Sequence, residues 1–349
     1  IKKENIVLIY SNSTGGFRDN LKAVYDYMIE NKLNNKYKIY CSLIEYKSFE
    51  TPVNVKTISN IKAIYYFLFS KYVFYGYGKL PIKPSKNQKV ISMFHGMPLK
   101  KIGGYLDSTK IHDYFFTYAL ASGKVFVPVI AKAFYCPIEK IMICGYPRND
   151  VLFKNGNYYP KNNKKLILWL PTYRDYQPDY LPVFNFQEIE KLDKQLSEVN
   201  IVLLLKLHEN NTLNNLDIPK LKNIIFYKHS DFMKASLDLY KLLACADALI
   251  TDYSSVYFDY LLLDRPIAFT LDDLNMYKSD RGFVFENIFE YMPGKKIYNQ
   301  KDFFDFCKEV ANGIDDYKLE RKRVNDLVNY YKDGNNCERL LKNIGIINN

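Results

Sequence analysis

Short apolar runs alternate with segments of helical periodicity along most of this chain of 349 residues. Runs such as residues 5–10 and 201–207 lack the polar/apolar alternation of a strand with one solvated face, so they predict parallel strands buried on both faces. Segments between such runs, such as residues 19–31, place apolar side chains at helical spacing. Because parallel strands need crossover connections, usually helices, the alternation predicts α/β units with right-handed crossovers.

The predicted elements form two consecutive series. Strands are predicted at residues 5–10, 38–43, 72–75, 90–94 and 141–144, and again at 166–170, 201–207, 224–227, 248–251 and 266–269. Helices are predicted at residues 19–31, 61–70 and 126–135, and again at 186–196, 236–245, 255–263, 302–312 and 320–331. The polar segment 155–165 is the best linker candidate. We therefore expect an α/β fold with two Rossmann-like lobes facing a cleft, in which ligands bind at the carboxyl ends of the strands.

The net charge of +11 is unevenly distributed. Residues 1–150 contain 22 Lys and Arg against 10 Asp and Glu, a net charge of +12, whereas the rest of the chain is close to neutral. Such a basic region favours an anionic partner, which can be a phosphate polymer, an anionic membrane surface or a nucleic acid. The sequence has neither a Cys/His zinc pattern nor an RRM-type aromatic signature, so we expect no nucleic-acid partner.

The six cysteines are scattered and include no C-x-x-C pair. Several lie in apolar runs, as Cys144 and Cys245 do, so we expect free, mostly buried thiols in a reducing compartment. The sequence shows no signal peptide at its start and no apolar run of about 18 residues, which predicts a soluble or peripheral protein. Because the sequence opens at Ile1, it leaves open whether another segment precedes this residue.

A histidine follows the predicted strand 90–94, in the segment Phe-His-Gly-Met-Pro-Leu-Lys-Lys at residues 94–101. Gly96 frees the backbone beside His95, and Pro98 stiffens the loop. A neutral imidazole at the carboxyl end of a strand can take a proton from an attacking hydroxyl near pH 7. The placement favours His95 as a general base over a capping or core histidine.

Two further motifs place arginines after predicted strands. In Gly-Tyr-Pro-Arg-Asn-Asp (145–150), Arg148 is either a phosphate-binding fork or part of an ordinary turn. In Leu-Pro-Thr-Tyr-Arg-Asp (170–175), Thr172 and Arg174 can reach a phosphate or a base. The alternative for Arg174 is a surface pair with Asp175.

Polar residues also follow two other strands of the second series. In Lys-Leu-His-Glu-Asn (206–210), strand alternation places Lys206 and His208 on one side, which suits a phosphoryl group. In Thr-Asp-Tyr-Ser-Ser (251–255), Ser254 and Ser255 can cap the predicted helix. The same helix start offers free N–H groups and the positive end of its dipole to a phosphate.

Other polar positions are weaker candidates. Asp272 and Asp273 could form a metal pair, but no third ligand lies near them in the sequence, so we expect no metal site. His112 and His229 lack a motif around them, and we expect surface or structural roles for both.

Together these motifs resemble those of the CDP-glycerol glycerophosphotransferases, the teichoic acid primases and polymerases. The matching segments, in the family order, are Phe-His-Gly-Met-Pro-Leu-Lys (94–100), Gly-Tyr-Pro-Arg-Asn-Asp (145–150), Pro-Thr-Tyr-Arg-Asp (171–175), Lys-Leu-His (206–208), Thr-Asp-Tyr-Ser-Ser-Val-Tyr-Phe-Asp (251–259) and Asp-Arg-Gly-Phe (280–283). Asp19 and Asn20, before a predicted helix, resemble the N-terminal motif of the family. The resemblance covers about residues 5–295. Three residues depart from it, because the family usually has Thr at Met97, Pro at Glu209 and often Trp at Phe94.

The resemblance implies a glycosyltransferase-B-like fold in which one lobe binds the acceptor and the other binds the donor. Residues 1–155, joined by the C-terminal helix 320–349, would form the acceptor and catalytic-base lobe, and residues 156–319 the CDP-polyol-binding lobe. The implied catalytic residues are His95 and His208. The donor-binding candidates are Thr172, Arg174, Lys206, Asp252, Ser254, Ser255, Arg281 and Gly282. The candidates for acceptor or phosphate contacts are Gly96, Lys100, Arg148, Asn149 and Asp150.

The implied reaction transfers glycerol phosphate, or a related polyol phosphate, from CDP-glycerol to an acceptor hydroxyl and releases CMP, in the synthesis of a teichoic-acid-like or capsular polymer. We expect no cofactor or metal, and as partners a CDP-polyol donor, an anionic polyol-phosphate or a glycan- or lipid-linked acceptor, and an anionic membrane surface. The expected location is the bacterial cytoplasm at the inner face of the membrane. The alternatives are a CDP-ribitol-dependent transferase, a nucleotide-sugar-dependent glycosyltransferase of the same fold, and a non-catalytic polymer-binding protein. The sequence leaves the polyol, the acceptor, the product length and the oligomeric state open.

Overall fold

The computed structural model describes residues 2–12, 18–44, 51–76, 78–106, 113–154, 158–159, 163–215, 220–228 and 237–348. The chain divides into two compact units. Unit 1 consists of Ile1–Pro98, Ile102–Asp150 and Val328–Asn349, and unit 2 consists of Leu99–Lys101 and Val151–Leu327. Most of the expected linker 155–165 lies outside the described residues, as do His112 and His229.

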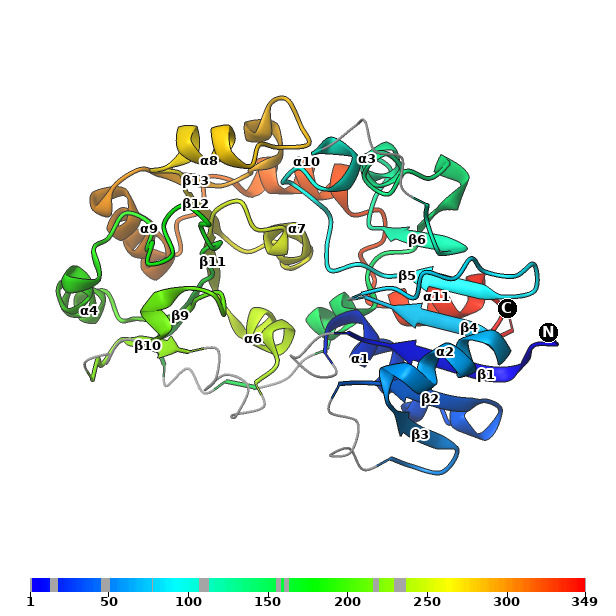
Figure 1. Cartoon of the computed structure of the whole chain (residues 1–349). Coiled ribbons are helices and arrows are strands. Elements are labelled where there is room, and N and C mark those ends of the chain that lie inside the picture. Colours follow the sequence, from blue (N-terminus) through cyan, green and yellow to red (C-terminus); the bar gives the residue numbers. More distant parts are fainter. Residues whose placement is uncertain are drawn as a thin grey trace. The chain divides into compact units, whose positions relative to one another are not determined.

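Unit 1 is built on a seven-stranded sheet in the order β3-β2-β1-β4-β5-β6-β7 (Figure 1). All neighbouring strands run parallel. The strands are β1 (Glu4–Tyr10), β2 (Lys38–Ser42), β3 (Val55–Ile58), β4 (Ser70–Tyr75), β5 (Lys89–Ser92), β6 (Tyr118–Ala121) and β7 (Ile141–Ile143). Its helices are α1 (Asp19–Glu30), α2 (Asn60–Phe69), α3 (Phe126–Ala133) and α11 (Asn336–Asn343).

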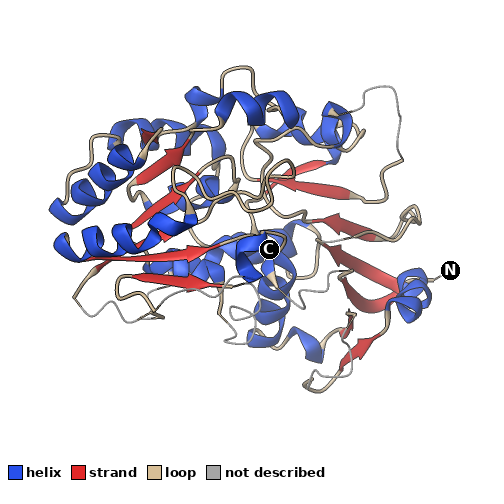
Figure 2. Ribbon diagram, turned by 60° about the vertical axis from the view of Figure 1, so that its left-hand side comes forward, coloured by secondary structure: helices blue, strands red, loops and turns tan. Residues whose placement is uncertain are grey.

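Unit 2 is built on a six-stranded parallel sheet in the order β10-β9-β8-β11-β12-β13. The strands are β8 (Lys165–Trp169), β9 (Ile201–Lys206), β10 (Ile224–Tyr227), β11 (Ala248–Thr251), β12 (Ile267–Thr270) and β13 (Lys295–Ile297). The helices are α4 (Ile189–Glu198), α6 (Leu239–Cys245), α7 (Val256–Tyr260), α8 (Leu274–Asp280), α9 (Gln300–Asn312) and α10 (Lys318–Val328). Helices pack against the faces of both sheets (Figure 2). Short 3-10 helices occupy Leu33–Asn35, Gly103–Tyr105, Ile138–Lys140, Pro147–Phe153, Phe186–Glu188, Thr212–Asn215, Leu261–Leu263 and Ile288–Tyr291.

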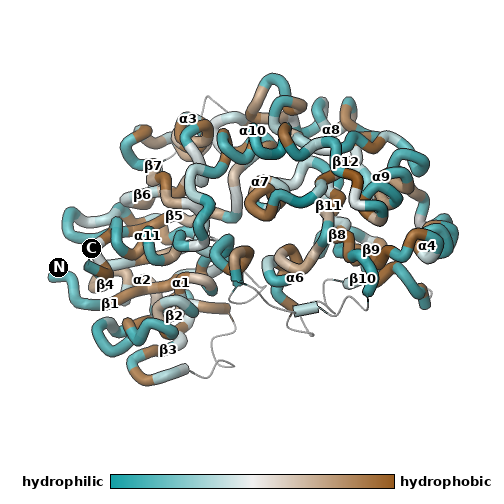
Figure 3. The backbone as a smooth tube through the Cα atoms, turned by 180° about the vertical axis from the view of Figure 1, so that it is seen from behind, coloured by the Kyte–Doolittle hydropathy of each residue, from teal (hydrophilic) through white to brown (hydrophobic). Residues whose placement is uncertain are grey.

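The core of unit 2 follows from strand alternation. Ile167 and Trp169 of β8 point to the face of the sheet that α4 and α9 cover, and both side chains are fully buried. The Trp169 ring lies 4.9 Å from that of Phe303 in α9, in an edge-to-face arrangement. Apolar residues on both faces of a strand are what a parallel sheet covered by helices requires. In Figure 3 these strands carry mainly hydrophobic colours, whereas the charged helix α10 is largely hydrophilic.

In both sheets the first three strands of the series are added in one direction, and the fourth strand is added on the other side of the first. In such doubly wound sheets the ligand crevice lies outside the carboxyl ends of the strands at this point of reversal. In unit 1 the reversal lies between β1 and β4, and in unit 2 between β8 and β11. The sequence-based prediction of two parallel-sheet α/β lobes is confirmed.

Several elements were not predicted from the sequence, namely β3, β6, β13 and α8, and the C-terminal helix expected at 320–349 is instead two helices, α10 and α11. β3 and β13 are edge strands, and an edge strand carries charged residues that break an apolar run. The predicted helix 255–263 is a short α-helix, α7, continued by a 3-10 turn at Leu261–Leu263. All six cysteines are free and buried. Within the described ranges, no helix combines the length and the apolar character needed to cross a membrane.

Candidate functional site in unit 2

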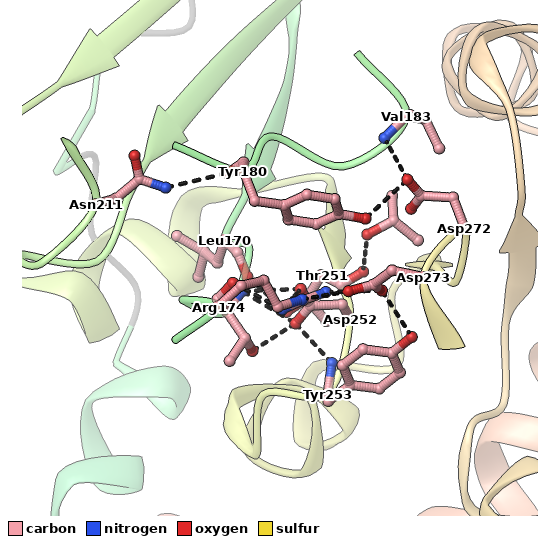
Figure 4. Close-up of polar contacts among 12 residues, drawn as sticks. Leu170, Arg174, Tyr180, Val183, Asn211, Thr251, Asp252, Tyr253, Asp272 and Asp273 are labelled. Atoms are coloured by element: carbon pink, nitrogen blue, oxygen red, sulfur yellow. Dashed lines mark hydrogen bonds and ion pairs between the residues drawn. The ribbon is translucent and has the colours of Figure 1, made fainter. Parts of the chain in front are cut away.

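Three loops at the carboxyl ends of β8, β11 and β12 converge on one buried arginine (Figure 4). Arg174 comes from the loop after β8, and its side chain is fully buried. The Nη1 atom lies 3.0 Å from Oδ2 of Asp252, which follows β11, and donates to the carbonyl of Thr172 over 2.7 Å. Nε and Nη2 donate to the two carboxylate oxygens of Asp273, after β12, over 2.5 and 3.1 Å. Arg174 therefore ties together the loops after β8 and β11, which flank the point of reversal, and the loop after β12, the next strand.

The guanidinium of Arg174 is also enclosed by aromatic rings. The rings of Tyr180, Tyr253 and Tyr277 lie with their centroids 4.8, 5.0 and 4.8 Å from its central carbon. A cation held over aromatic faces and removed from water interacts favourably with the ring quadrupoles. Burial by itself would lower the pKa of Arg174, but Asp252 and Asp273 outweigh it and raise the pKa. The arginine is therefore a fixed charge in this site.

Asp252 is saturated by hydrogen bonds from its surroundings. Its carboxylate accepts the backbone N–H of Thr172 over 2.9 Å and the Thr172 hydroxyl over 2.5 Å. It also accepts the backbone N–H of Tyr253 over 2.6 Å. With Arg174 as its counter-ion and no exposed surface, Asp252 holds the loop that leads into α7. The structure thus brings the donor-binding candidates Thr172, Arg174 and Asp252 together as one internal cluster.

Asp273 and Asp272 have separate sets of partners. Asp273 accepts hydrogen bonds from Arg174 and from the hydroxyls of Tyr176 and Tyr253. Burial tends to raise the pKa of Asp273, but the hydrogen bonds and charge of Arg174 hold it below its ordinary value. Asp272 accepts the Tyr180 hydroxyl over 2.7 Å, and burial raises its pKa. Among the residues that the structure describes, no cluster of three or more His, Cys, Asp or Glu could hold a metal ion.

Ser254 and Ser255 lie at the start of α7, directly after this cluster. Both are half-buried. Ser255 makes no capping hydrogen bond, and the Ser254 hydroxyl accepts only a long one, 3.5 Å, from the N–H of Val256. The expected capping role is therefore wrong for Ser255 and weak for Ser254. A phosphate at this turn would meet two hydroxyls and the first backbone N–H groups of the helix.

His208 lies two residues beyond the end of β9, next to the β8 loop. It is exposed, and its ring stacks on Tyr173 with the centroids 5.5 Å apart. Its Nδ1 accepts the backbone N–H of Asn210 over 3.2 Å. This contact leaves Nε2 as the nitrogen that carries the proton in the neutral ring. Lys206, the last residue of β9, is half-buried.

Arg281 and Gly282 follow α8. Arg281 is exposed, and its closest carboxylate oxygen, of Asp175, is 3.9 Å away. The surface pair expected for Asp175 thus involves Arg281, because Arg174 is buried. Gly282 has a φ of +67°, and a Cβ on it would lie 3.1 Å from Cδ of Lys101. Lys100 and Lys101 come from the motif that contains His95, yet they belong to unit 2.

Candidate site residues in unit 1

His95 lies in the turn after β5 and is exposed. The backbone reaches it through Phe94, whose φ of +47° is a left-handed conformation that a non-glycine residue adopts at a cost. The carbonyl of Phe94 accepts the Asn20 amide over 3.3 Å. The carbonyl of His95 accepts Nη1 of Arg148 over 3.1 Å. Contacts from α1 and from the loop after β7 thus hold the backbone of the histidine.

Arg148 is almost fully buried. Its Nη1 also donates to Asp19 at the start of α1, over 2.7 Å, and its backbone N–H donates to Asn20 over 3.1 Å. These contacts make Arg148 a residue that positions the His95 turn. Asp19 and Asn20, recognised only as a family-like motif, supply the partners.

Asp150 accepts the backbone N–H groups of Asn336 and Cys337, both over 2.8 Å. These are the first two residues of α11, so the carboxylate caps a helix 186 residues further along the chain. Gly145, at the other end of the motif, has a φ of +76°, and a Cβ there would lie 2.2 Å from the Asn336 side chain. The start of helix α11 therefore packs against the segment 145–150. Burial raises the pKa of Asp150 to about 6.

Sequence reasoning weighed Asp273 only as half of a possible metal pair, and it did not single out Tyr180, Tyr253 and Tyr277 as site residues. Charge balance could have pointed to Asp273. An arginine buried after one strand needs carboxylates nearby, and the ends of the neighbouring strands can supply them. Asp273 follows the predicted strand 266–269 by four positions, which could have suggested it.

Comparison with known proteins

Two doubly wound parallel sheets, with charged residues held at the carboxyl ends of the strands, place this chain in the two-lobed α/β class that includes glycosyltransferase-B-like enzymes. Residues 1–345 match the model of the CDP-glycerol:poly(glycerophosphate) glycerophosphotransferase family. The chain belongs to this family of enzymes.

Three similar proteins carry teichoic acid functions in their names. The teichoic acid ribitol-phosphate polymerase TarL of Staphylococcus aureus (strain NCTC 8325 / PS 47) is 26% identical over 99% of this chain and 63% of its own length. The teichoic acid glycerol-phosphate primase of Bacillus subtilis (strain 168) is 31% identical over 65% of this chain and 56% of its own length. The structure of the wall teichoic acid polymerase TagF matches with a TM-score of 0.80 and 24% identity, covering 98% of this chain and 89% of that one. This last likeness establishes the fold. The chain spans a little over half the length of these two sequence relatives.

Proposed function

We propose that this protein transfers glycerol phosphate, or a closely related polyol phosphate, from a CDP-activated donor to an acceptor hydroxyl in the synthesis of a teichoic-acid-like or capsular polymer. The observation that carries the proposal is the family match over residues 1–345. The buried Arg174 cluster supports it, because the cluster fixes the loop that ends in Ser254 and Ser255 at the ligand edge of the second sheet.

In the proposed reaction the oxygen of the acceptor hydroxyl attacks the β-phosphorus of the CDP-polyol. The bond between this phosphorus and the bridging oxygen breaks, and CMP leaves with that oxygen. His95 takes the proton of the attacking hydroxyl. His208, Lys206 and the N–H groups near Ser254 stabilise the charge on the phosphoryl group, because such transfers depend mainly on positioning and electrostatics.

The experiment is a donor panel with a glycerol-phosphate primer. Purified protein is incubated with CDP-glycerol, CDP-ribitol and UDP-glucose, and the release of CMP or UDP is measured with and without the primer. We expect CMP release that depends on both a CDP-polyol and the primer. UDP release from the sugar nucleotide would support the glycosyltransferase alternative, and no turnover with any donor would support a polymer-binding protein.

The choice between two polyols is part of the same panel. Ribitol-phosphate and glycerol-phosphate enzymes both occur among the relatives. Glycerol phosphate is favoured here only because the chain matches a glycerophosphotransferase family model. A ratio of kcat/KM above tenfold for one CDP-polyol would identify the donor.

We further propose that the acceptor is an anionic polyol-phosphate or lipid-linked chain, and that the protein works at the inner face of the bacterial cytoplasmic membrane. The basic character of residues 1–150, with a net charge of +12, supports an anionic partner. A binding assay with vesicles of anionic and of neutral lipid tests the membrane part, and equal binding to both would contradict it.

A further inference from the structure

Unit 2 contains a second polar feature, a pocket beside the Arg174 cluster. The loops after β8, β9 and β12 line it, together with the segment before α4 and the start of α9. Its volume is about 920 Å³, which lies in the upper part of the range of about 300–1,000 Å³ for small-molecule sites in proteins. The pocket is therefore much larger than a single polyol unit such as glycerol requires.

Hydrogen bonds between the loops fix the walls of this pocket. The side-chain amide of Asn211, after β9, donates to the carbonyl of Tyr180, after β8, over 3.0 Å (Figure 4). The N–H of Thr212 donates to the carbonyl of Pro178 over 2.9 Å. The Tyr180 hydroxyl in turn donates to Asp272, after β12, over 2.7 Å. The pocket is thus formed within the folded unit and does not depend on a ligand for its shape.

One residue of the pocket wall has a strained backbone. Val183 has a φ of +56°, a left-handed conformation that a β-branched residue rarely adopts. Its N–H donates to Asp272 over 3.0 Å, which holds the turn in place (Figure 4). Strained backbone of this kind persists only where the surrounding structure enforces it, and it is concentrated at sites that bind ligands. The strain therefore points to a ligand in this pocket.

The charges of the pocket exclude anions. Asp179, Glu188 and Asp272 line it, and none of its described lining residues is Lys, Arg or His. Two of these carboxylates already accept hydrogen bonds, Asp272 as above and Glu188 from the N–H of Asn185 over 3.0 Å and the amide of Gln300 over 2.7 Å. The described residues include no group of three or more ligands for a metal ion. An uncharged ligand therefore fits this pocket better than a phosphate or a metal ion does.

The remaining polar side chains of the pocket are mainly amides. They belong to Gln177, Asn185, Gln187, Asn215 and Gln300. An amide both donates and accepts hydrogen bonds, as a hydroxyl group does, so a set of amides can bind a ligand that carries many hydroxyls. Tyr180 and Phe184 add aromatic surface, against which the apolar face of a sugar ring can pack. This combination is suited to a saccharide.

We propose that this pocket binds a neutral saccharide of about the size of a disaccharide. The inference goes beyond the proposed function, because the CDP-polyol donor and a polyol-phosphate chain are both anionic and the pocket excludes anions. Neither Ser254 nor Ser255 lines the pocket. Tyr180, which lines it, also covers the Arg174 guanidinium. The saccharide site therefore adjoins the Arg174 cluster and is separate from the turn proposed for the donor phosphates.

The test uses the full chain and saturation-transfer NMR, which gives the Kd of maltose, cellobiose and chitobiose. Glucose 6-phosphate is the anionic probe, and choline is the cationic probe. Asn215→Phe places a ring in the pocket, and Asp179→Lys reverses one of its charges. The matched controls are Asn312→Phe and Asp316→Lys, at exposed positions of unit 2 that do not line the pocket. Trp169 fluorescence during urea unfolding checks that each variant is folded.

We expect at least one neutral disaccharide to bind the wild type, and Asn215→Phe to weaken it by at least about tenfold, while Asn312→Phe leaves the Kd unchanged. Glucose 6-phosphate should bind Asp179→Lys more tightly than the wild type or Asp316→Lys, because the added cation attracts the phosphate. The proposal is overturned if no disaccharide binds the wild type, or if a folded Asn215→Phe variant keeps the wild-type Kd. Tighter binding of glucose 6-phosphate or choline than of every disaccharide to the wild type would also overturn it.

The same protein preparations separate this inference from the proposed function. CMP release from CDP-glycerol is measured beside the binding of the disaccharides. If a disaccharide binds in the pocket while no CDP-polyol is turned over, the saccharide site stands and the proposed donor is wrong. If CDP-glycerol is turned over while no disaccharide binds, the proposed function stands and the saccharide site is wrong.

Discussion

At the scale of single residues, burial separates two arginines that the sequence treated alike. Arg174 is buried, and its Nε, Nη1 and Nη2 atoms all donate to protein acceptors. Arg281 is exposed, with a single carboxylate oxygen at 3.9 Å. The first therefore positions the loops of the site, and the second has room to meet a ligand.

Replacing Arg174 by Ala should destabilise unit 2 by about 3–5 kcal/mol, because two buried carboxylates then lose their counter-ion. Trp169 is the only tryptophan and lies in the core of unit 2, so its fluorescence during urea unfolding reports on this unit. The matched control is Arg281→Ala, for which we expect a change within about 0.5 kcal/mol. Equal urea midpoints for the two variants would contradict the assigned role of Arg174.

Replacing His95 by Ala should lower turnover by about two to four orders of magnitude, which is the usual contribution of a general base. His95 is exposed and is held through its backbone carbonyl, so the variant should fold normally and bind CDP-glycerol with unchanged affinity. Steady-state CMP release gives kcat, and calorimetry gives the Kd. Turnover within threefold of the wild type would remove His95 from the mechanism.

At the scale of elements, the segment 145–150 and helix α11 depend on each other. Asp150 accepts the first two N–H groups of the helix, and Asn336 donates its side-chain amide to the carbonyl of Tyr146 over 3.1 Å. The Arg148 guanidinium in the same segment supports the backbone of His95. The C-terminal helix thus stabilises the loop that positions the candidate base.

Asp150→Ala should destabilise the docking of α11 by about 1–3 kcal/mol, since two buried N–H groups lose their acceptor. Hydrogen exchange of the backbone amides in residues 336–343 measures the effect. Asp150→Asn keeps an acceptor oxygen and should cost less. Protection of α11 that is the same in the alanine variant and the wild type would show that the carboxylate does not hold the helix.

The stability of α11 docking should depend on pH, because the pKa of Asp150 is raised in the folded protein. The pKa of Asp150 is about 6 in the folded protein and about 3.9 in an unfolded chain. The folded state therefore holds this proton more tightly, and the contribution of Asp150 to stability is largest below pH 4 and falls as the pH rises through 6. The protection of α11 should fall over that range in the wild type and not in Asp150→Asn.

At the scale of the whole molecule, positive charge is concentrated in residues 1–150, with a net charge of +12. Lys79, Lys83 and Lys86 are exposed members of this set, in the segment before β5. Lys83 has Asp113 as an exposed partner at 3.0 Å, and such a pair is weak. A long polyol-phosphate chain carries a negative charge on every unit and can interact with several of these lysines.

The apparent affinity for a long anionic acceptor should fall steeply with salt, because charges at a surface are screened over about 8–10 Å at ordinary ionic strength. The KM for a short neutral acceptor should change little. Changing Lys79, Lys83 and Lys86 to Glu should have the effect of high salt on the long acceptor only. The same change at Lys301, Lys308 and Lys322, which are exposed in unit 2, is the control. Equal salt responses for the two acceptors would contradict a guiding role of the basic region.

The sequence predicted the strands with continuous apolar runs and missed β3 and β13, at sheet edges, and β6, inside its sheet. Strands such as β1, β8 and β9 are covered on both faces, so their apolar runs are visible without any knowledge of the fold. β13 begins with two lysines, and β6 reads Tyr-Ala-Leu-Ala, which also suits a helix. Whether such a segment forms a strand depends on pairing with neighbouring strands, and a local sequence pattern does not contain that information.

The sequence by itself determined the order of strands and helices, the placement of polar motifs after buried strands, and through those motifs the family. These features are local, since apolar periodicity and turn residues act over a few positions. Only the tertiary structure decided which charges meet. Arg174 and Asp273 are 99 residues apart, Asp150 and Asn336 are 186 apart, and Lys100 belongs to unit 2 through its pairing with Phe283. The physical reason is that a buried charge requires a counter-charge near it in space, and only the folded sheet brings distant loops to one edge.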